Sequence, residues 1–528
     1  MSGICGSPIP SPLDVDDDTT TTAASNVMRL TDMSITPERE RNLSDESADG
    51  EDRDQLEGFG YQEVLRRTMG LMRATAVNIS TSSVATAVFT LFAYGIITGG
   101  TGLLVWTWLI GFVVMLLVTL MFAELGSSMP LAGALYQWAA RLVGPRTGYL
   151  TGWLYAASQI ALVSAVAYGI SPFIASLFGI QLTPAQQQLA AIILILACTV
   201  LNLIGVMIAS AVATIGAVAE VGGMVVLIVV LFVTGFGNQP ATVLVEAQGL
   251  PEDAHMWAAF GAAMLFGSWA WTGLEMATDM AEETKDASKV IPRAGISSII
   301  TTFLVGIVFL IAAVLAIPGT VDDIVASANP LQAIIEGNTG AVFYKLIAVV
   351  IIVAVFVCAM TYQALTARII FSLARDRRVP FSSSLAKVPA KTQVPHISTV
   401  LVGVIACAII VFIDALAAIT TACLTGLFLC YVLVVWAQLV QRLRGRWTPH
   451  QWSLGKFSLP ANVLAAVLGT ALTLNLAWPR SEDVWYNRYS SVLFVLLVVI
   501  LAGIYYLCAG DEGRRAIKRI ESVPPPRP

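Results

Sequence analysis

The stretch Leu265–Pro292, LFGSWAWTGLEMATDMAEETKDASKVIP, is the part of the chain from which the fold can be inferred. It begins as an apolar segment and then contains two tryptophans, Trp269 and Trp271, a glycine, Gly273, and a carboxylate, Glu275. An ionisable side chain inside a membrane helix is costly and usually faces a cavity or a partner. Because a glycine and bulky rings precede this carboxylate, the stretch predicts a helix that is interrupted in mid-membrane and lines a solute pocket.

The composition is that of a membrane protein. Of 528 residues, 56% are hydrophobic and only 12% are charged, which predicts an all-α polytopic membrane protein. The seven cysteines give no disulfide framework, and the three histidines have no metal-ligand spacing, so we expect no metal and no other cofactor. Neither a GxxxxGK[ST] loop nor an HExxH or GxSxG motif occurs, which argues against ATP hydrolysis and against an enzyme.

Twelve apolar stretches are long enough to cross a bilayer. They are residues 77–99, 104–127, 148–178, 185–207, 210–236, 256–281, 295–317, 341–373, 398–415, 417–440, 461–478 and 489–509. They define a domain over residues 58–510. Residues 1–57 are acidic and rich in Ser, Thr and Pro, which predicts a disordered tail without a cleavable signal peptide. Residues 511–528 form a second, short tail.

The basic residues orient these spans. With the N-terminus inside, only Lys345, Arg480 and Arg488 of the 30 lysines and arginines fall in outside loops. An even number of spans with both termini cytoplasmic is therefore expected, in what we expect to be the plasma membrane.

The spans also group into two blocks of five, residues 77–236 and 256–440, followed by an extra pair at 461–509. An odd block size makes the second copy run upside down, so the grouping predicts a five-plus-five inverted repeat. In transporters of that kind the solute binds between the first helices of the two blocks.

The first span contains many hydroxyl groups, Ser83 and Thr86 among them. We expect an unwound segment at Thr86, Ala87 and Val88, whose amides and positive helix end would hold a substrate carboxylate. The alternative is that the hydroxyls bond back to their own helix or to a neighbouring one.

Two intramembrane carboxylates, Glu275 and Glu220, belong to the predicted site region. Glu275 is expected to bind a proton, to bond the first span, or to cap a half-helix. Glu220 lies in the fifth span before two glycines, and it serves either proton or cation coupling or a buried structural hydrogen bond. Asp279 is expected nearer the cytoplasmic interface.

Two loops look like cytoplasmic elements. The segment FAELGSSMPLAGALYQWAARLVGP, residues 122–145, predicts a hairpin that packs under the pocket. In SLARDRRVP, residues 372–380, Arg375 and Asp376 are placed for an ion pair, although a simple positive-inside anchor explains this loop equally well.

Four segments resemble signatures of the amino acid–polyamine–organocation (APC) superfamily of permeases. The 122–145 segment is similar to the signature after the second helix, WAWTGLEMATDMAEETKDASKVIPRA (269–294) to that of the sixth, and SLARDRRVP to the element after the eighth. SSVATAVFTLFAYGIITGG (82–100) looks like the first helix of the branch with GABA, choline and other amino acid permeases. The resemblance covers about residues 60–510.

The resemblance implies alternating access in a five-plus-five fold with two extra helices. It assigns the carboxylate end of the substrate to the break at residues 86–88 and the amino end to Ser268, Trp269 and Ala270, with Trp269 and Trp271 as gating aromatics.

Two positions depart from the family pattern. Glu220 stands near where several relatives carry a lysine that substitutes for a sodium ion, so that coupling role does not carry over unchanged. Ala87 stands where many relatives have glycine, which leaves room for a substrate without a carboxylate, such as choline.

Together these features predict a secondary transporter for a small amino-group solute, an amino acid or GABA, coupled to protons or working by exchange. A choline or polyamine permease is the alternative within the fold, and a transporter-like nutrient sensor is the alternative from another class. The expected partners are the small-molecule substrate, membrane lipid and protons, with no nucleic acid.

Overall fold

The computed structural model describes residues 50–250, 255–413, 416–480, 484–509 and 511–518. The chain divides before Asp52, and every helix from residue 71 onward belongs to the unit Asp52–Pro528. Residues 1–49 of the expected disordered tail, and residues 519–528 of the C-terminal tail, lie outside the described residues. Residues 52–57, which the sequence prediction placed in that tail, are helical, and Asp52 and Leu56 are buried there.

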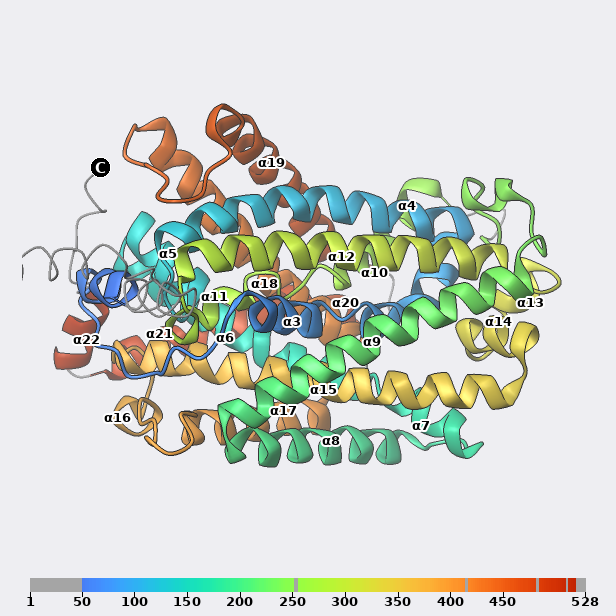
Figure 1. Ribbon diagram of the computed structural model, residues 1–528, viewed down its shortest axis with the longest axis horizontal. Coiled ribbons are helices and arrows are strands. Elements are labelled where there is room, and N and C mark those ends of the chain that lie inside the picture. The colour runs from blue at the N-terminus through green and yellow to red at the C-terminus, as the bar shows by residue number, and fades with distance from the viewer. Residues whose placement is uncertain (1–49, 251–254, 414–415, 481–483, 510, 519–528) are drawn as a thin grey trace, which may run out of the picture. The chain divides into compact units, whose positions relative to one another are not determined.

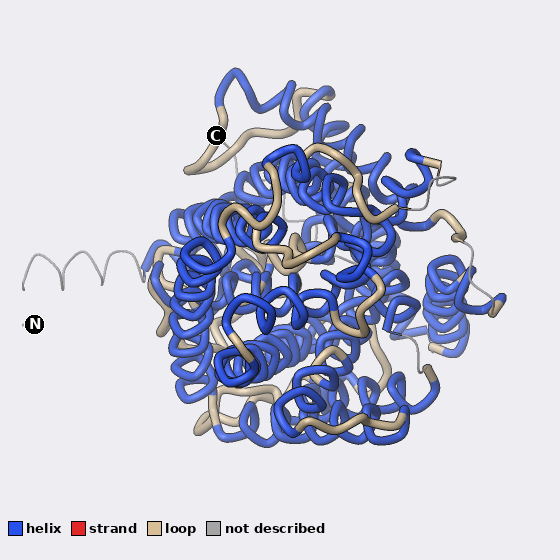
Figure 2. The backbone as a smooth tube through the Cα atoms, turned by 90° about the vertical axis from the view of Figure 1, so that its right-hand side faces the viewer, coloured by secondary structure: helices blue, strands red, loops and turns tan. Residues whose placement is uncertain are grey.

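The predicted all-α class is confirmed. Helices make up 79% of the structure. The described residues contain no strand beyond one isolated bridge between Met69 and Thr284, and Figure 2 shows helices joined by loops.

The helices follow one another along the chain in the order shown by the colours of Figure 1. They are α3 (Leu71–Ser82), α4 (Val84–Ser128), α5 (Ala134–Leu142), α6 (Pro145–Tyr168), α7 (Ser171–Phe178), α8 (Pro184–Ile204), α9 (Val206–Gly235), η1 (Ala241–Leu244), α10 (Met256–Trp269), α11 (Met276–Asp279), η2 (Ala281–Glu283), α12 (Ala287–Leu315), α13 (Val321–Val325), α14 (Pro330–Thr339), α15 (Ala341–Arg375), α16 (Ser382–Leu385), α17 (His396–Phe412), α18 (Leu416–Leu443), η3 (Gly455–Phe457), α19 (Ser458–Ala477), α20 (Trp485–Arg488), α21 (Ser490–Cys508) and α22 (Asp511–Lys518).

Nine helical stretches among the described residues are long and apolar enough to cross a membrane, judged by length and composition. One of them, Leu71–Ser128, has 58 residues, which is about 87 Å of helix against a hydrocarbon core of about 30 Å. It turns at Gly100, whose φ of 63° is left-handed, and so covers two of the predicted spans. Met256–Trp269 and His396–Phe412 are shorter apolar helices. Each predicted span thus coincides with helical structure, while the count of twelve and the inverted repeat stay predictions.

Burial separates central from peripheral helices. In the apolar part of α18 that could cross a membrane, 83% of the residues are buried inside the protein. In the corresponding part of α21, 17% are buried. The exposed residues of α21 are large and apolar, for example Leu497 and Ile500, which suits a face that contacts lipid. In the centre, α4 packs along both α10 and α12, and in Figure 1 α8 and α17 lie together on the opposite flank.

Small residues allow the central helices to approach closely. A Cβ built on Gly111 of α4 would lie 2.0 Å from the carbonyl oxygen of Gly267 of α10, and one on Gly267 would lie 2.4 Å from that of Thr107. No side chain fits such spacings, so these glycines fix how α10 sits against α4.

We expect Gly111→Ala to lower the thermal stability of the purified protein in detergent, because the new methyl group forces two backbones apart at a cost of about 1–3 kcal/mol. The matched control is Gly222→Ala in α9, where nothing lies within 4 Å of the added carbon and stability should not fall. Equal melting temperatures for the two variants would contradict the packing argument.

Candidate functional site

The first span is interrupted at Ser83. Helix α3 ends at Ser82 and α4 begins at Val84, with Ser83 at φ −3° and ψ 99° between them. The predicted unwound segment at residues 86–88 is therefore wrong by a few positions, because Thr86, Ala87 and Val88 already belong to the first turns of α4. The break falls earlier because the Ser83 hydroxyl accepts a bond from the Thr86 amide at 3.1 Å and caps the new helix.

Glu220 of α9 also caps the start of α4. Its Oε1 accepts bonds from the Ser83 hydroxyl at 2.8 Å and from the Ala85 amide at 3.0 Å, and its side chain is 3% exposed. The buried carboxylate thus lies at the positive end of a half-helix, where an anion is favoured. Of the two roles left open for Glu220, the structure shows the hydrogen bond directly.

The sixth span is interrupted, but the break begins at Ala270, so two of the three residues predicted for it, Ser268 and Trp269, are still helical. Helix α10 ends at Trp269 and α11 begins at Met276, so Ser268 and Trp269 are its last helical residues and Ala270 is the first beyond them. Gly273 has a φ of 79°, and an added Cβ would meet the Tyr362 hydroxyl at 2.8 Å. Only glycine fits this turn without strain.

The two breaks contact each other through α3. The Asn78 side chain donates from Nδ2 to the Leu274 carbonyl at 3.1 Å and accepts from the Ala277 amide at 2.7 Å. The Thr81 hydroxyl lies 3.3 Å from the Gly273 carbonyl oxygen. The side chains of one interrupted helix therefore satisfy the backbone of the other.

Glu275 is fully enclosed by neutral donors. Its Oε1 accepts from the Tyr155 hydroxyl and from Gln159 Nε2, each at 3.1 Å, and its Oε2 accepts from the Tyr431 hydroxyl at 2.6 Å. The side chain is 1% exposed. Tyr155 and Gln159 come from α6 and Tyr431 from α18, and none of the three was predicted from the sequence.

Asp279 joins this cluster. Its side chain is completely buried in the protein and accepts from the Tyr155 hydroxyl at 2.6 Å and from the Gly133 amide at 3.0 Å, while its place near the cytoplasmic interface stays a prediction. One phenol thus bridges two buried carboxylates. The signal in the sequence was the four-residue spacing from Glu275, which places both on one side of a helical turn.

The two tryptophans point to different neighbours. Trp269 donates from Nε1 to the Thr90 hydroxyl of α4 at 3.1 Å, so it lies against the first interrupted helix. Trp271 packs on Trp108 and Phe112, with ring centroids 4.9 and 5.7 Å away. That packing accounts for Trp271, and only Trp269 is retained as an aromatic of the site.

A second polar cluster lies at the predicted cytoplasmic end of these helices. Arg368 pairs with Glu283, and Arg375 pairs with Glu282 at 2.8 Å rather than with Asp376, which corrects the predicted pair. Asp376 instead accepts from the hydroxyls of Tyr61, at 3.0 Å, and Tyr136.

The N-terminal segment closes over this cluster. The Arg375 guanidinium lies 3.8 Å from the Tyr61 ring centroid. Burial raises the pKa of the Tyr61 phenol, and the Asp376 carboxylate raises it further, so the phenol stays protonated and donates. Asp52 accepts from the amides of Asp286 and Ala287 at the start of α12, which explains why residues 52–58 are ordered against the bundle.

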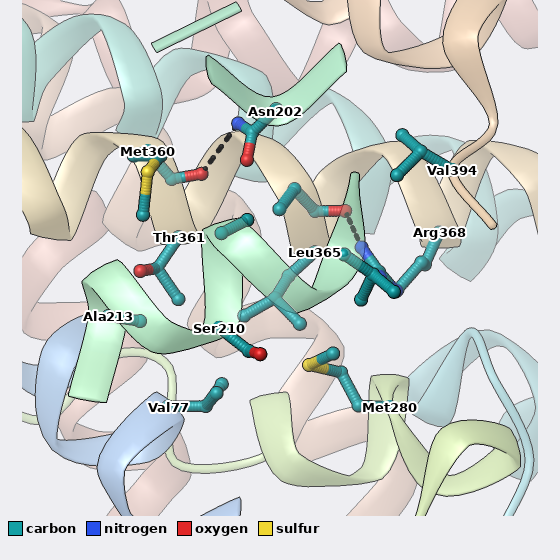
Figure 3. Close-up of a pocket in the computed structure, with 13 residues that line it drawn as sticks. Val77, Asn202, Ser210, Ala213, Met280, Met360, Thr361, Leu365, Arg368 and Val394 are labelled. Atoms are coloured by element: carbon teal, nitrogen blue, oxygen red, sulfur yellow. Dashed lines mark hydrogen bonds between the residues drawn. The ribbon is translucent and has the colours of Figure 1, made fainter. Parts of the chain in front are cut away.

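The predicted hairpin does pack beneath the interrupted sixth span. The Gly133 amide reaches Asp279, and the Ala132 amide donates to Glu282 at 3.1 Å. A separate cavity lies nearby between α3, α8, α9 and α15, with Ser210, Thr361 and Arg368 in its wall (Figure 3). Its lining contains none of the predicted site residues.

Within the described residues, no group of three or more His, Cys, Asp or Glu side chains is arranged to hold a metal ion. What the geometry provides is two interrupted helices, three buried carboxylates with neutral partners, and a set of ion pairs at one end. These are the parts of a membrane carrier.

The family model for amino acid permeases matches residues 69–502. The chain belongs to this family. Amino-acid permease BAT1 of Arabidopsis thaliana is 25% identical over 492 residues, covering 84% of this chain and 92% of that protein. Amino-acid permease 2 of Neurospora crassa is 25% identical, with coverage of 85% and 86%. Serine/threonine exchanger SteT of Bacillus subtilis is 25% identical, with coverage of 78% and 91%. This permease is therefore a membrane transporter of the APC superfamily.

We expect Arg368→Ala to destabilise the permease, because Glu283, 2% exposed, would be left as a buried charge without its partner at a cost of about 3–5 kcal/mol. The double variant Arg368→Met with Glu283→Gln should recover most of that loss. Thermal unfolding of the two purified variants measures both, and a double variant as unstable as the single one would contradict the pairing.

Proposed function

We propose that this permease is a secondary active transporter of a small amino-group solute, in the first place an amino acid or GABA, working by alternating access with proton coupling or exchange. The observation that carries the proposal is Glu275, a carboxylate buried at the break of α10 and α11 and bonded only to neutral donors. The names of the relatives, amino-acid permeases and a serine/threonine exchanger, support the same solute class.

Glu275 can serve both tasks that such a carrier requires. A carboxylate held by two phenols and one amide accepts either a proton or a substrate ammonium group, and these compete for the same oxygens. The Tyr155 hydroxyl connects Glu275 to Asp279, so a proton on one carboxylate can reach the other through a single phenol.

Alternating access requires the polar cluster at the cytoplasmic end to separate. The pairs Arg368–Glu283 and Arg375–Glu282 join α15 to the segment after α11, and Tyr61 covers Asp376. We propose that these contacts close the inward path and break when it opens. We also propose that both termini are cytoplasmic and that the membrane is the plasma membrane.

Uptake into proteoliposomes containing the full chain tests the function. Radiolabelled amino acids, GABA, polyamines and choline are offered with and without an imposed pH gradient and with unlabelled solute inside. Accumulation of at least one solute supports the proposal. If none of the four classes is moved under any condition, the proposal fails.

The variant Glu275→Gln keeps the side-chain volume and removes the titratable group. If Glu275 couples protons, we expect uptake by this variant to lose its dependence on the pH gradient while exchange of internal for external solute continues. Initial rates measured from about pH 5 to about pH 8 provide the test. A pH profile identical to that of the unmodified permease would assign Glu275 a structural role.

The variant Trp269→Ala should raise the apparent KM for the solute by about tenfold, since an indole face over an ammonium group contributes about 1–2 kcal/mol. Trp271→Phe is the matched control, because Trp271 packs against α4 and should leave the apparent KM unchanged. Equal effects of the two substitutions would argue against a binding role for Trp269.

A further inference from the structure

We propose that Asp279 is a second proton-binding residue of this permease. In the arrangement described here Glu275 holds one proton, and a solute ammonium group that binds at Glu275 moves that proton through Tyr155 to Asp279. The inference rests on the proposed function, because it assumes that the solute binds at the breaks. It deepens that function by naming where the coupling proton lies and which residue takes it when the solute arrives.

The count of hydrogens between the two carboxylates carries the inference. The Tyr155 oxygen lies 2.6 Å from Asp279 Oδ2 and 3.1 Å from Glu275 Oε1. A phenol has one hydrogen to donate, so it donates to one of these oxygens at a time, while its lone pairs accept. Both contacts are hydrogen bonds when one of the carboxylates is protonated and donates to the phenol oxygen. With both carboxylates ionised, two oxygens would face each other with no hydrogen between them.

Burial favours the same count of one proton on the pair. Glu275 is 1% exposed and Asp279 is completely buried, one helical turn away. Their partners are two phenols, one amide and one backbone N–H group, all of them neutral. Two negative charges so close together and shielded from water repel each other strongly, and a shared proton removes one of the charges.

The surroundings favour the negative charge on Asp279. Its contact with Tyr155 is the shorter of the two, as expected for a hydrogen bond to an ionised acceptor, and Oδ1 accepts from the Gly133 amide at 3.0 Å. The positive charge of Arg368, which is paired with Glu283, also acts on Asp279. The proton of the pair is therefore assigned to Glu275.

The groups around Glu275 suit a protonated carboxyl. With the hydrogen on Oε1, the carbonyl oxygen Oε2 still accepts from the Tyr431 hydroxyl at 2.6 Å. The Gln159 amide fits either state, because its unpartnered oxygen can turn toward a carboxyl hydrogen in place of its nitrogen. The other titratable groups that face Glu275 are the Tyr362 phenol and the Cys430 thiol, and both are neutral near neutral pH.

An ammonium group at Glu275 changes this balance, because it bonds an ionised carboxylate more strongly than a carboxylic acid. The transfer conserves atoms and charge. The O–H bond of Glu275 breaks as the Tyr155 oxygen takes that proton, and the O–H bond of Tyr155 breaks as Asp279 Oδ2 takes the other. Tyr155 is a phenol again at the end, Glu275 is a carboxylate that faces the ammonium group, and Asp279 is a carboxylic acid.

The transfer brings the proton to the elements that we propose close the inward path. Asp279 bonds the Gly133 amide of the hairpin, and the neighbouring Ala132 amide donates to Glu282, which is paired with Arg375. Loss of the proton from Asp279 toward that end resets the pair. The proposal therefore gives a coupling of one proton per solute.

Infrared spectroscopy locates the proton without reference to transport, since a carboxylic acid has a carbonyl band that a carboxylate lacks. On the purified full chain at neutral pH we expect a band that disappears in Glu275→Gln and shifts in protein made with ¹³C-labelled glutamate. The same band should stay in Glu336→Gln, where the carboxylate bonds Gln332 on α14. A band of the pair that shifts with ¹³C-labelled aspartate instead, or no band that is lost in Glu275→Gln, would overturn the inference.

The same measurement with L-serine and GABA as probes follows the transfer. For a probe that binds, as measured by isothermal titration, we expect the glutamate band to fall and an aspartate band to appear. That new band should be missing in Asp279→Asn. A glutamate band that stays unchanged while the probe is bound contradicts the transfer.

The variant Tyr155→Phe removes the phenol oxygen and keeps the ring. We expect uptake driven by a pH gradient to fall at least about tenfold relative to exchange in the same proteoliposomes, because a carrier that returns loaded needs no net proton transfer. Tyr149→Phe is the matched control, a buried phenol of the same helix α6 that bonds the Ala502 carbonyl, and its ratio should not change.

Asp279→Asn should lower the same ratio and replaces Tyr155→Phe if that variant does not fold. A structural role for Tyr155 or Asp279 would lower uptake and exchange by the same factor, and this result would also overturn the inference.

The two proposals fail separately. A permease that accumulates an amino acid or GABA and has no proton on Glu275 keeps its transporter function, and the proton assignment is wrong. If no solute is moved, the transporter function is wrong and the solute-driven transfer fails with it. The infrared measurement without solute then still decides where the proton of the pair lies.

Discussion

Backbone groups that lose their helix partners inside a membrane must find new ones, and the centre of this permease is built around that requirement. Two helices are interrupted, at Ser83 and over Ala270–Glu275. Several of the freed amides and carbonyls are bonded by side chains from other helices, chiefly Asn78 and Glu220. These hydrogen bonds from the rest of the bundle stabilise each break, because a bilayer core contains no water that could replace them.

This arrangement gives the interrupted helices more than a structural role. At a helix end that is capped by a side chain, one hydrogen-bond acceptor can replace another without unwinding a turn. The backbone hydrogen bonds of a continuous helix cannot be exchanged in this way. The same argument links the site to the polar cluster at the end of α15, where ion pairs with Glu282 and Glu283 hold the segment after α11. The interrupted sixth span and that polar cluster are therefore joined through a few residues.

Close helix packing supports both features. Gly111 and Gly267 bring α4 and α10 nearly into backbone contact, and the rings of Trp108, Phe112 and Trp271 fill the space beside them. Trp269, the last residue of α10, instead bonds Thr90 near the start of α4. The aromatic pair of the sequence thus divides between packing and the site.

The sequence by itself determined the helical membrane class, the places of the long apolar helices and the interruption of the sixth span, because apolar length, glycine and an intramembrane carboxylate are local signals. It also identified Glu220 and Glu275 as candidate site residues. Only the tertiary structure decided that Glu220 caps α4, that Asp279 is buried, that Arg375 pairs with Glu282, and that Tyr155, Gln159 and Tyr431 surround Glu275. Each of these depends on contacts between helices far apart in the chain, and no periodicity within one helix encodes which neighbour it will meet.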